Sequence, residues 1–125
     1  MKNINHSLNW FEIPVSDFER ARKFYSTIYD FDMPSVRMGE NQLGFFPVQP
    51  KHIGGAIVKG EGYIPSQHGA LIYLNGGENL EDVLQKVNKA GGKVTKAKTQ
   101  ITADLGYFAT FIDTEGNKVA VHSMQ

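Results

Sequence analysis

The sequence predicts an α+β domain made of two similar halves, and three observations support this fold class. Residues 8–29 have the pattern of a short strand that runs directly into an amphipathic helix. The same pattern returns near residue 70, and each occurrence is followed by about three further strand-like runs. Neither half can bury a sheet face by itself, so we expect the two halves to pair and to curl around a shared concavity.

The first strand is expected over residues 10–15. It is rich in aromatic and β-branched residues, which favour strands: Trp10, Phe11, Ile13 and Val15. Pro14 stands near the end of the run, where a missing N–H is tolerated at the edge of a sheet.

A helix is expected to follow at once. Ser16 or Asp17 can cap its N-terminus, and Glu19 lies in the first turn, where a negative charge interacts favourably with the helix dipole. Apolar side chains then recur at three- and four-residue steps: Phe18, Ala21, Phe24 or Tyr25, and Ile28. One face of the helix is therefore apolar, and the charged residues between these positions keep the other face in water.

The rest of the first half predicts three more strands and a loop. Residues 33–38 and 43–48 are partly apolar, and the Gly-Glu-Asn sequence at 39–41 between them is typical of a hairpin turn. Residues 53–58 contain a Gly-Gly pair, which weakens a strand but lets another group approach its backbone closely. Residues 59–68 contain two glycines and a proline without a clear apolar pattern, and they indicate a loop.

The second half repeats this order. Residues 70–74 predict a strand, and Asn79 offers a cap for the next helix. The apolar positions of that helix are Leu80, Val83, Leu84 and Val87. The Ala-Gly-Gly sequence at 90–92 is typical of a helix end. When Asn79 is aligned with Asp17, Val83 falls opposite Ala21, so the two helices occupy equivalent places in a tandem repeat.

Three strands are expected to complete the second half. A short strand opens at Val94, another covers residues 107–112, and the last covers residues 119–122. The Asp-Thr-Glu-Gly-Asn sequence at 113–117 predicts the turn between the last two. We therefore expect a single domain over residues 1–125, with modules of approximately 6–59 and 68–123 joined by the loop 60–67.

Composition and charge limit the classes of partner. The chain has 125 residues, with 13 basic and 13 acidic side chains. It therefore has no excess of positive charge that would attract nucleic acid or an anionic membrane. No apolar run approaches the roughly 20 residues that span a bilayer. The polar start lacks the apolar core of a secretory signal, which makes the cytoplasm the expected compartment. The expected partners are a small-molecule ligand and a second copy of the chain, with no nucleic acid and no membrane.

The chain contains no cysteine, which removes disulfides, thiolate metal sites and thiol nucleophiles together. Any metal must therefore be held by His, Glu, Asp or Gln. Phosphate-binding glycine loops and nucleophilic serine motifs are also missing from the sequence.

Three runs in the right order resemble the vicinal oxygen chelate superfamily, the group of glyoxalase, bleomycin-resistance and extradiol-dioxygenase proteins. They are FEIPVSDFERARKFYSTIYDF, LEDVLQKVNKAGGKV and FATFIDTEGNKVAVHS. The last run carries Asp-Thr-Glu-Gly-Asn where this family usually has Asp-Pro-Glu-Gly-Asn. The resemblance covers essentially the whole chain. It implies two βαβββ modules that form a curved, open mixed sheet around a central cavity, commonly in a dimer.

The resemblance also implies where a metal would be bound. Metal-using members place a His or Gln in the first strand, a His or Glu in the strand that opens the second half, and a Glu in the last strand. These positions fall on Trp10, Ala70 and Ala120 in this sequence, and none of the three side chains can ligate a metal. The family's metal site is therefore expected to be lost, so no cofactor is predicted.

Glu12 and His122 are the candidate polar residues of a substitute site. Each lies two residues from a family metal position, so strand alternation predicts that both point into the cavity. They can hold a weak divalent metal, or they can orient an organic ligand. In the alternative reading, Glu12 pairs with a neighbouring Lys or Arg and His122 is inert near the C-terminus.

Aromatic residues supply the remaining candidates for ligand binding. Trp10 either forms the floor of the cavity, where it would stack on a planar ligand, or fills the core. Tyr63 lies in the midpoint loop, where binding residues tend to gather, and Tyr107 belongs to a predicted strand. The candidate ligand-binding residues are thus Trp10, Glu12, Tyr63, Tyr107 and His122.

Three functional hypotheses follow. In the first, a metal-free binding protein similar to bleomycin-resistance proteins holds a small planar or amphiphilic molecule in an aromatic-lined cavity at a dimer or module interface. In the second, an enzyme of the lyase, isomerase or dioxygenase type acts on a carbonyl substrate, with Glu12 buried beside Trp10 as general acid or base. In the third, side chains fill the cavity and only a dimer surface matters.

Overall fold

The computed structural model describes residues 4–125; residues 1–3, at the polar start of the sequence, lie outside the described part. Two helices and eight strands form two four-stranded sheets, which confirms the predicted α+β class. Sheet A contains β1 (Trp10–Pro14), β2 (Ser35–Met38), β3 (Asn41–Phe45) and β4 (Gly54–Lys59). Sheet B contains β5 (Tyr73–Asn75), β6 (Lys93–Thr102), β7 (Gly106–Ile112) and β8 (Lys118–Ser123). The helices are α1 (Phe18–Tyr29) and α2 (Glu81–Val87).

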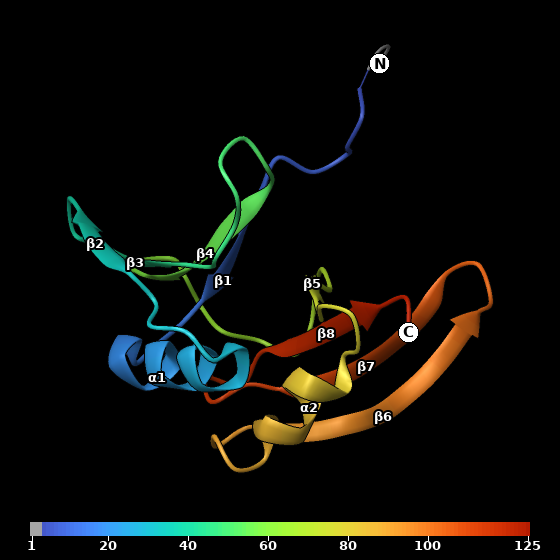
Figure 1. The fold of residues 1–125 in the computed structure, drawn as a ribbon. Helices are drawn as coiled ribbons and strands as arrows, with labels where there is room; N and C mark the ends of the chain where they lie inside the picture. The colour runs from blue at the N-terminus through green and yellow to red at the C-terminus, as the bar shows by residue number, and fades with distance from the viewer. Residues whose placement is uncertain (1–3) are drawn as a thin grey trace.

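The two sheets have the same internal order. Sheet A runs β1-β4-β3-β2 and sheet B runs β5-β8-β7-β6, so each is a βαβββ module. In each sheet the first strand pairs in parallel with the last, while the other pairs are antiparallel. Figure 1 shows the sheets splayed apart rather than closed, with α1 beside sheet A and α2 beside β6 and β7. The sheets are therefore mixed and open, as predicted, and they are separate from each other.

Helix α1 forms where the periodicity predicts it. Asp17 caps its N-terminus, because its carboxylate accepts from the backbone N–H of Arg20 at 3.1 Å. At the C-terminus Asp30 adopts a left-handed conformation with φ of 52°, and its N–H bonds to the last turn. The buried residues of the helix are those of the predicted apolar face: Phe18, Ala21, Phe24, Tyr25 and Ile28.

Helix α2 forms where its apolar steps predict it, but its N-cap is Leu80, which makes no side-chain cap hydrogen bond. Asn79, the predicted cap, stands one residue before Leu80, and its side chain accepts from the N–H of Glu81 at 3.0 Å. Gly91 has φ of +107°, a left-handed conformation that ends the chain's helical path and favours glycine. Among the described residues, no helix is long and apolar enough to cross a membrane.

Three predicted strands differ clearly from those observed. The run at 43–48 is observed two residues earlier, as β3. The strand expected over residues 70–74 is only β5; residues 70–72 line cavities, and Ile72 is hydrogen-bonded to β8 through its carbonyl oxygen, which accepts from the N–H of Ala120 at 2.9 Å. The strand expected to be short at Val94 is β6, which extends over ten residues. Strand β6 lies at the edge of its sheet and is mostly exposed, so it has no regular apolar alternation, and register shifts let it follow β7 along its whole length.

One hydrophobic core joins the two modules. Residues of α1 and α2 pack in a single cluster with Ile13 and Ile57 of sheet A and with Phe111 and Val121 of sheet B. The face of each sheet that packs against this cluster is called its inner face, and the opposite face is its outer face. Since side chains alternate along a strand, the neighbours of these residues, such as Glu12 and His122, lie on the outer faces.

Candidate functional site

Three of the predicted site residues meet on the outer face of sheet A. The Tyr63 hydroxyl donates to Oε1 of Glu12 at 2.8 Å, and the Trp10 indole N–H donates to Oε2 at 3.4 Å. Trp10 is 44% exposed, so it does not fill the core. Glu12 is exposed as well. The expectation that Glu12 is buried beside Trp10 is therefore wrong, because β1 is an edge strand whose outer face is not covered by a helix.

The strand residues next to Trp10 and Glu12 on this face are apolar or aromatic. Glu12, Ala56 and Phe45 form one row across β1, β4 and β3, and the Trp10 and Phe45 rings lie 6.2 Å apart. Leu43, Ala56 and Val58 form a small buried cluster on this face, against which Phe45 and Tyr63 pack. On the outer face, strand alternation gives β1 to β4 a single charged residue, Glu12.

The other two predicted residues belong to sheet B, on opposite faces. His122 is half-buried on the outer face, where its Nε2 lies 2.6 Å from the carbonyl oxygen of Leu105. Tyr107 packs against the shared core on the inner side, with Nζ of Lys98 4.7 Å from its ring centre. The structure thus brings Trp10, Glu12 and Tyr63 together, while His122 and Tyr107 lie apart from them and from each other.

Two further aromatic residues lie on the same face as His122, and neither was predicted as a site residue from the sequence. Phe108 lies directly across from His122 in the β7–β8 pair, and the rings of Phe108 and Tyr73 are 6.3 Å apart. Tyr73 is exposed. Strand alternation could have assigned both rings to the face of His122, since Phe108 stands beside a buried alanine in the sequence and Tyr73 beside a buried leucine.

The residues at the family's metal positions do not fit a metal. The indole N–H of Trp10 is a hydrogen-bond donor, Ala70 lies before β5, and Ala120 is fully buried within β8. Within residues 4–125, no three His, Cys, Asp or Glu side chains come close enough together to hold an ion. Glu12 and His122 have separate hydrogen-bond partners, so the described chain does not bring these two candidate ligands together.

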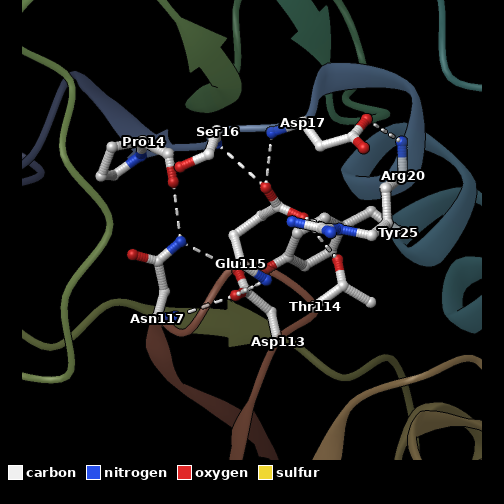
Figure 2. Close-up of polar contacts among 9 residues, drawn as sticks. All are labelled: Pro14, Ser16, Asp17, Arg20, Tyr25, Asp113, Thr114, Glu115 and Asn117. Carbon is white, nitrogen blue, oxygen red and sulfur yellow. Dashed lines mark hydrogen bonds and ion pairs between the residues drawn. The ribbon is translucent and has the colours of Figure 1, made fainter.

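A polar turn of the second half holds the candidate site in position. Figure 2 shows this turn, residues 113–117, lying against the end of β1 and the start of α1. The Asn117 side-chain amide donates to the carbonyl oxygen of Pro14 at 2.7 Å, and its oxygen accepts from the N–H of Ser66 at 3.0 Å. Asn117 therefore fixes the strand that carries Glu12 and the loop that carries Tyr63 relative to each other.

Glu115 of the same turn caps helix α1 from a distant part of the chain. One of its oxygens accepts from the N–H groups of Ser16 and Asp17 at 2.9 and 2.7 Å, and the other pairs with Nε of Arg20 at 2.7 Å. The Glu115 side chain is 0% exposed. Burial alone would raise its pKa, but the hydrogen bonds from Arg20 and from the two N–H groups outweigh burial and lower the pKa below its usual value.

Asp113 completes this arrangement. Its carboxylate accepts from the Tyr25 hydroxyl at 2.7 Å and from the backbone N–H groups of Glu115 and Asn117. Burial and the neighbouring charge of Asp113 raise the pKa of Tyr25 well above its usual value, which keeps the hydroxyl protonated and able to donate. The sequence predicted only a turn at residues 113–117. The contact between Tyr25 and Asp113 joins residues 88 positions apart and leaves no local pattern in the sequence.

An apolar groove of about 550 Å³ lies where the two modules meet. It is lined mainly by the segment between β3 and β4, which includes Val48, and by β5 with the segment that leads into it, which include Ile72 and Tyr73. Strand β1 contributes Phe11. A smaller cavity of about 150 Å³ lies between Glu12 and the loop residues Ser66 and His68. The candidate site therefore lies beside open space at the edge of β1.

Comparison with known proteins gives one family match and one curated relative. The model of the Glyoxalase/Bleomycin resistance protein/Dioxygenase superfamily matches residues 7–121. A glyoxylase-like domain-containing protein from Didymella fabae is 28% identical over 123 residues, and the match covers 94% of each chain.

Solved structures share the fold at low sequence identity. A glyoxalase I mutant from Zea mays superposes with a TM-score of 0.70 at 12% identity over 94% of this chain, which spans only 44% of the maize chain. A glyoxalase/bleomycin resistance protein from Albidiferax ferrireducens gives 0.67 at 18% identity, covering 93% and 98% of the two chains. An antibiotic-binding protein from a Streptomyces species gives 0.63 at 22% identity, covering 98% of both.

Proposed function

The chain belongs to the Glyoxalase/Bleomycin resistance protein/Dioxygenase superfamily, and from this premise we propose that it binds a small organic molecule without the family's metal. The observation that carries the proposal is the cluster of Trp10, Glu12 and Tyr63 on the apolar outer face of sheet A. An exposed tryptophan and a partly buried tyrosine beside one oriented carboxylate suit a flat ligand with a polar group. A fold neighbour that binds an antibiotic supports this class of function.

We further propose that a second copy of the chain completes the site. Glu12 and His122 lie on the outer faces of two sheets whose inner faces share one core, so a single chain turns these residues away from each other. In a twofold dimer, the outer face of sheet A can meet the outer face of the partner's sheet B, and the same contact forms twice. Large exposed apolar side chains on both faces, Val36 and Met38 on sheet A and Tyr73 on sheet B, support such an interface.

The binding proposal predicts that a flat neutral probe, 2-naphthalenemethanol, perturbs Trp10. Trp10 is the only tryptophan, so its indole N–H gives one resonance in a ¹H–¹⁵N spectrum. That resonance is expected to shift and to saturate with probe concentration. Tyr63→Ala removes one aromatic wall and is expected to weaken binding about tenfold. Tyr63→Phe keeps the ring and serves as the matched control. A resonance that does not move, or equal affinities for Tyr63→Ala and Tyr63→Phe, would contradict the proposal.

The metal-free proposal predicts that divalent ions leave the stability unchanged. Thermal melts are expected to coincide with and without Ni²⁺, Zn²⁺, Mn²⁺ and EDTA, because an ion that binds only the folded state raises the melting temperature. Metal analysis of freshly purified protein is expected to find no stoichiometric ion. Stoichiometric metal together with a lower melting temperature in EDTA would overturn this part of the proposal and make Glu12 and His122 the residues to mutate.

An acid–base enzyme is the second candidate function. The hydrogen bond between Tyr63 and Glu12 favours it, since a hydroxyl and a carboxylate at 2.8 Å can pass a proton. Its substrate would be a carbonyl compound, and its reaction would be of the lyase, isomerase or dioxygenase type. The exposure of Glu12 gives this candidate less support than the binding function.

A further inference from the structure

The carboxylate of Glu12 occupies an unusual place for a charge. It is the single charged side chain that β1 to β4 present on the outer face of sheet A, where the other strand side chains are apolar or aromatic except Asn41. A charge placed against apolar surface loses hydration when another molecule covers it. Whatever covers this face must therefore compensate Glu12.

Glu12 is held in a fixed orientation by its two aromatic neighbours. The Tyr63 hydroxyl binds one oxygen and the Trp10 indole binds the other, so the carboxylate is held between two rings. The hydrogen bond and the negative charge of Glu12 raise the pKa of Tyr63, which keeps its hydroxyl a donor. Both donors are neutral, so they orient the negative charge without cancelling it.

No cation of the described chain cancels this charge. Within residues 4–125, Glu12 takes part in no ion pair, although the chain forms ion pairs elsewhere, at Arg20 and Arg22. Lys118 and His68 line the small cavity next to Glu12, but neither comes within ion-pair distance of it. The oriented carboxylate thus has room for an external cation.

We propose that the ligand of this site carries a positively charged nitrogen, an ammonium or amidinium group attached to a flat apolar body. The cation would pair with Glu12, and the exposed ring of Trp10 would attract it further, since aromatic rings bind cations through their negative faces. The flat body would lie on the apolar surface beside Phe45. This inference rests on the proposed binding function and adds the charge of the ligand to it.

Three probes with the same ring and different charge test the proposal. They are the cation 2-naphthylmethylammonium, the neutral 2-naphthalenemethanol and the carboxylate anion of 2-naphthaleneacetic acid. Affinities are measured at neutral pH by the shift of the Trp10 indole resonance and by calorimetry. In the wild type, the cation is expected to bind about tenfold more tightly than the neutral alcohol, and the anion more weakly than either. Added salt is expected to reduce the difference in affinity between the cation and the alcohol, because the pairing of the cation with Glu12 is partly electrostatic.

Glu12→Gln keeps the size of the side chain and removes its charge. It is expected to abolish the preference, so that the variant binds the cation and the neutral alcohol with similar affinities. Glu61→Gln is the control for general surface charge, since Glu61 is exposed in the adjacent loop, and it is expected to preserve the preference. Equal melting temperatures for both variants and the wild type would show that folding is not the cause.

The outcomes separate this inference from the binding function. If the alcohol binds and the cation binds no more tightly, the proposal of a cationic ligand is wrong and the binding function stands. The same conclusion follows if Glu12→Gln retains the preference for the cation. If none of the probes moves the Trp10 resonance, both are overturned. If Glu12→Gln changes the oligomeric state measured by light scattering and leaves the order of affinities intact, Glu12 serves the contact between copies and the inference is wrong.

Discussion

Replacing Phe24 with alanine is expected to lower the free energy of unfolding by about 3–5 kcal/mol. Phe24 is 1% exposed and belongs to α1, yet its ring lies 5.8 Å from Phe111 of β7 and packs close to the backbone at Gly92. The substitution therefore opens a cavity at the junction of the two modules. Urea unfolding followed by circular dichroism and by Trp10 fluorescence measures the loss.

The same experiment tests whether the halves are energetically one unit. Because a single core includes residues of both modules, the two signals are expected to give coincident transitions in the wild type and in Phe24→Ala. Phe31→Ala is the matched control, since Phe31 is only partly buried at the edge of the core, and its cost is expected to be clearly smaller. A second transition in Phe24→Ala, or equal costs for both phenylalanines, would contradict a shared core.

Replacing Glu115 with alanine is expected to cost about 3 kcal/mol, because it leaves several donors without a partner. The backbone N–H groups of Ser16 and Asp17 lose their acceptor at the start of α1, and Arg20 loses its ion pair. Glu19→Ala removes an exposed acid from the same helix turn and is expected to cost well under 1 kcal/mol. Chemical unfolding at neutral pH compares the two variants, and a similar cost for both would contradict the capping role.

The pH dependence of Glu115 has a defined sign. Its pKa is lower in the folded state than in the unfolded state, so its carboxylate stabilises the fold fully at pH values above the unfolded pKa. The contribution is lost as the pH falls through the lower pKa of the folded state. The difference in stability between the wild type and Glu115→Ala is therefore expected to shrink on acidification from neutral pH, and a difference that grows there would contradict the assignment.

Local patterns in the sequence were enough to predict most of the fold. The apolar steps in residues 18–28 predicted α1, and the two predicted candidates for its cap, Ser16 and Asp17, include the residue that caps it, because capping depends on groups a few residues apart. The length of β6 could not be predicted, because an exposed edge strand that follows its neighbour through register shifts shows no regular alternation.

The alternation of side chains along a strand predicted one part of the site. Trp10 and Glu12 stand two residues apart in one strand, so a shared face followed from the sequence. Alternation assigns a side chain to a face of its own sheet, but it says nothing about how two sheets are oriented, and this is why His122 was predicted to share a cavity with Glu12. The role of Glu115 lay beyond any local pattern, since its partners Ser16 and Asp17 are 99 and 98 residues away.

The capping of α1 by Glu115 has a consequence for the order of events during synthesis. A ribosome releases the segment of α1 long before it makes residues 113–117, so the new chain lacks the acceptor for the N–H groups of Ser16 and Asp17, which directly precede the helix. Contacts of such long range are formed late and slow the approach to the native state. A nascent chain stopped before Glu115 would therefore carry α1 with only the local cap from Asp17.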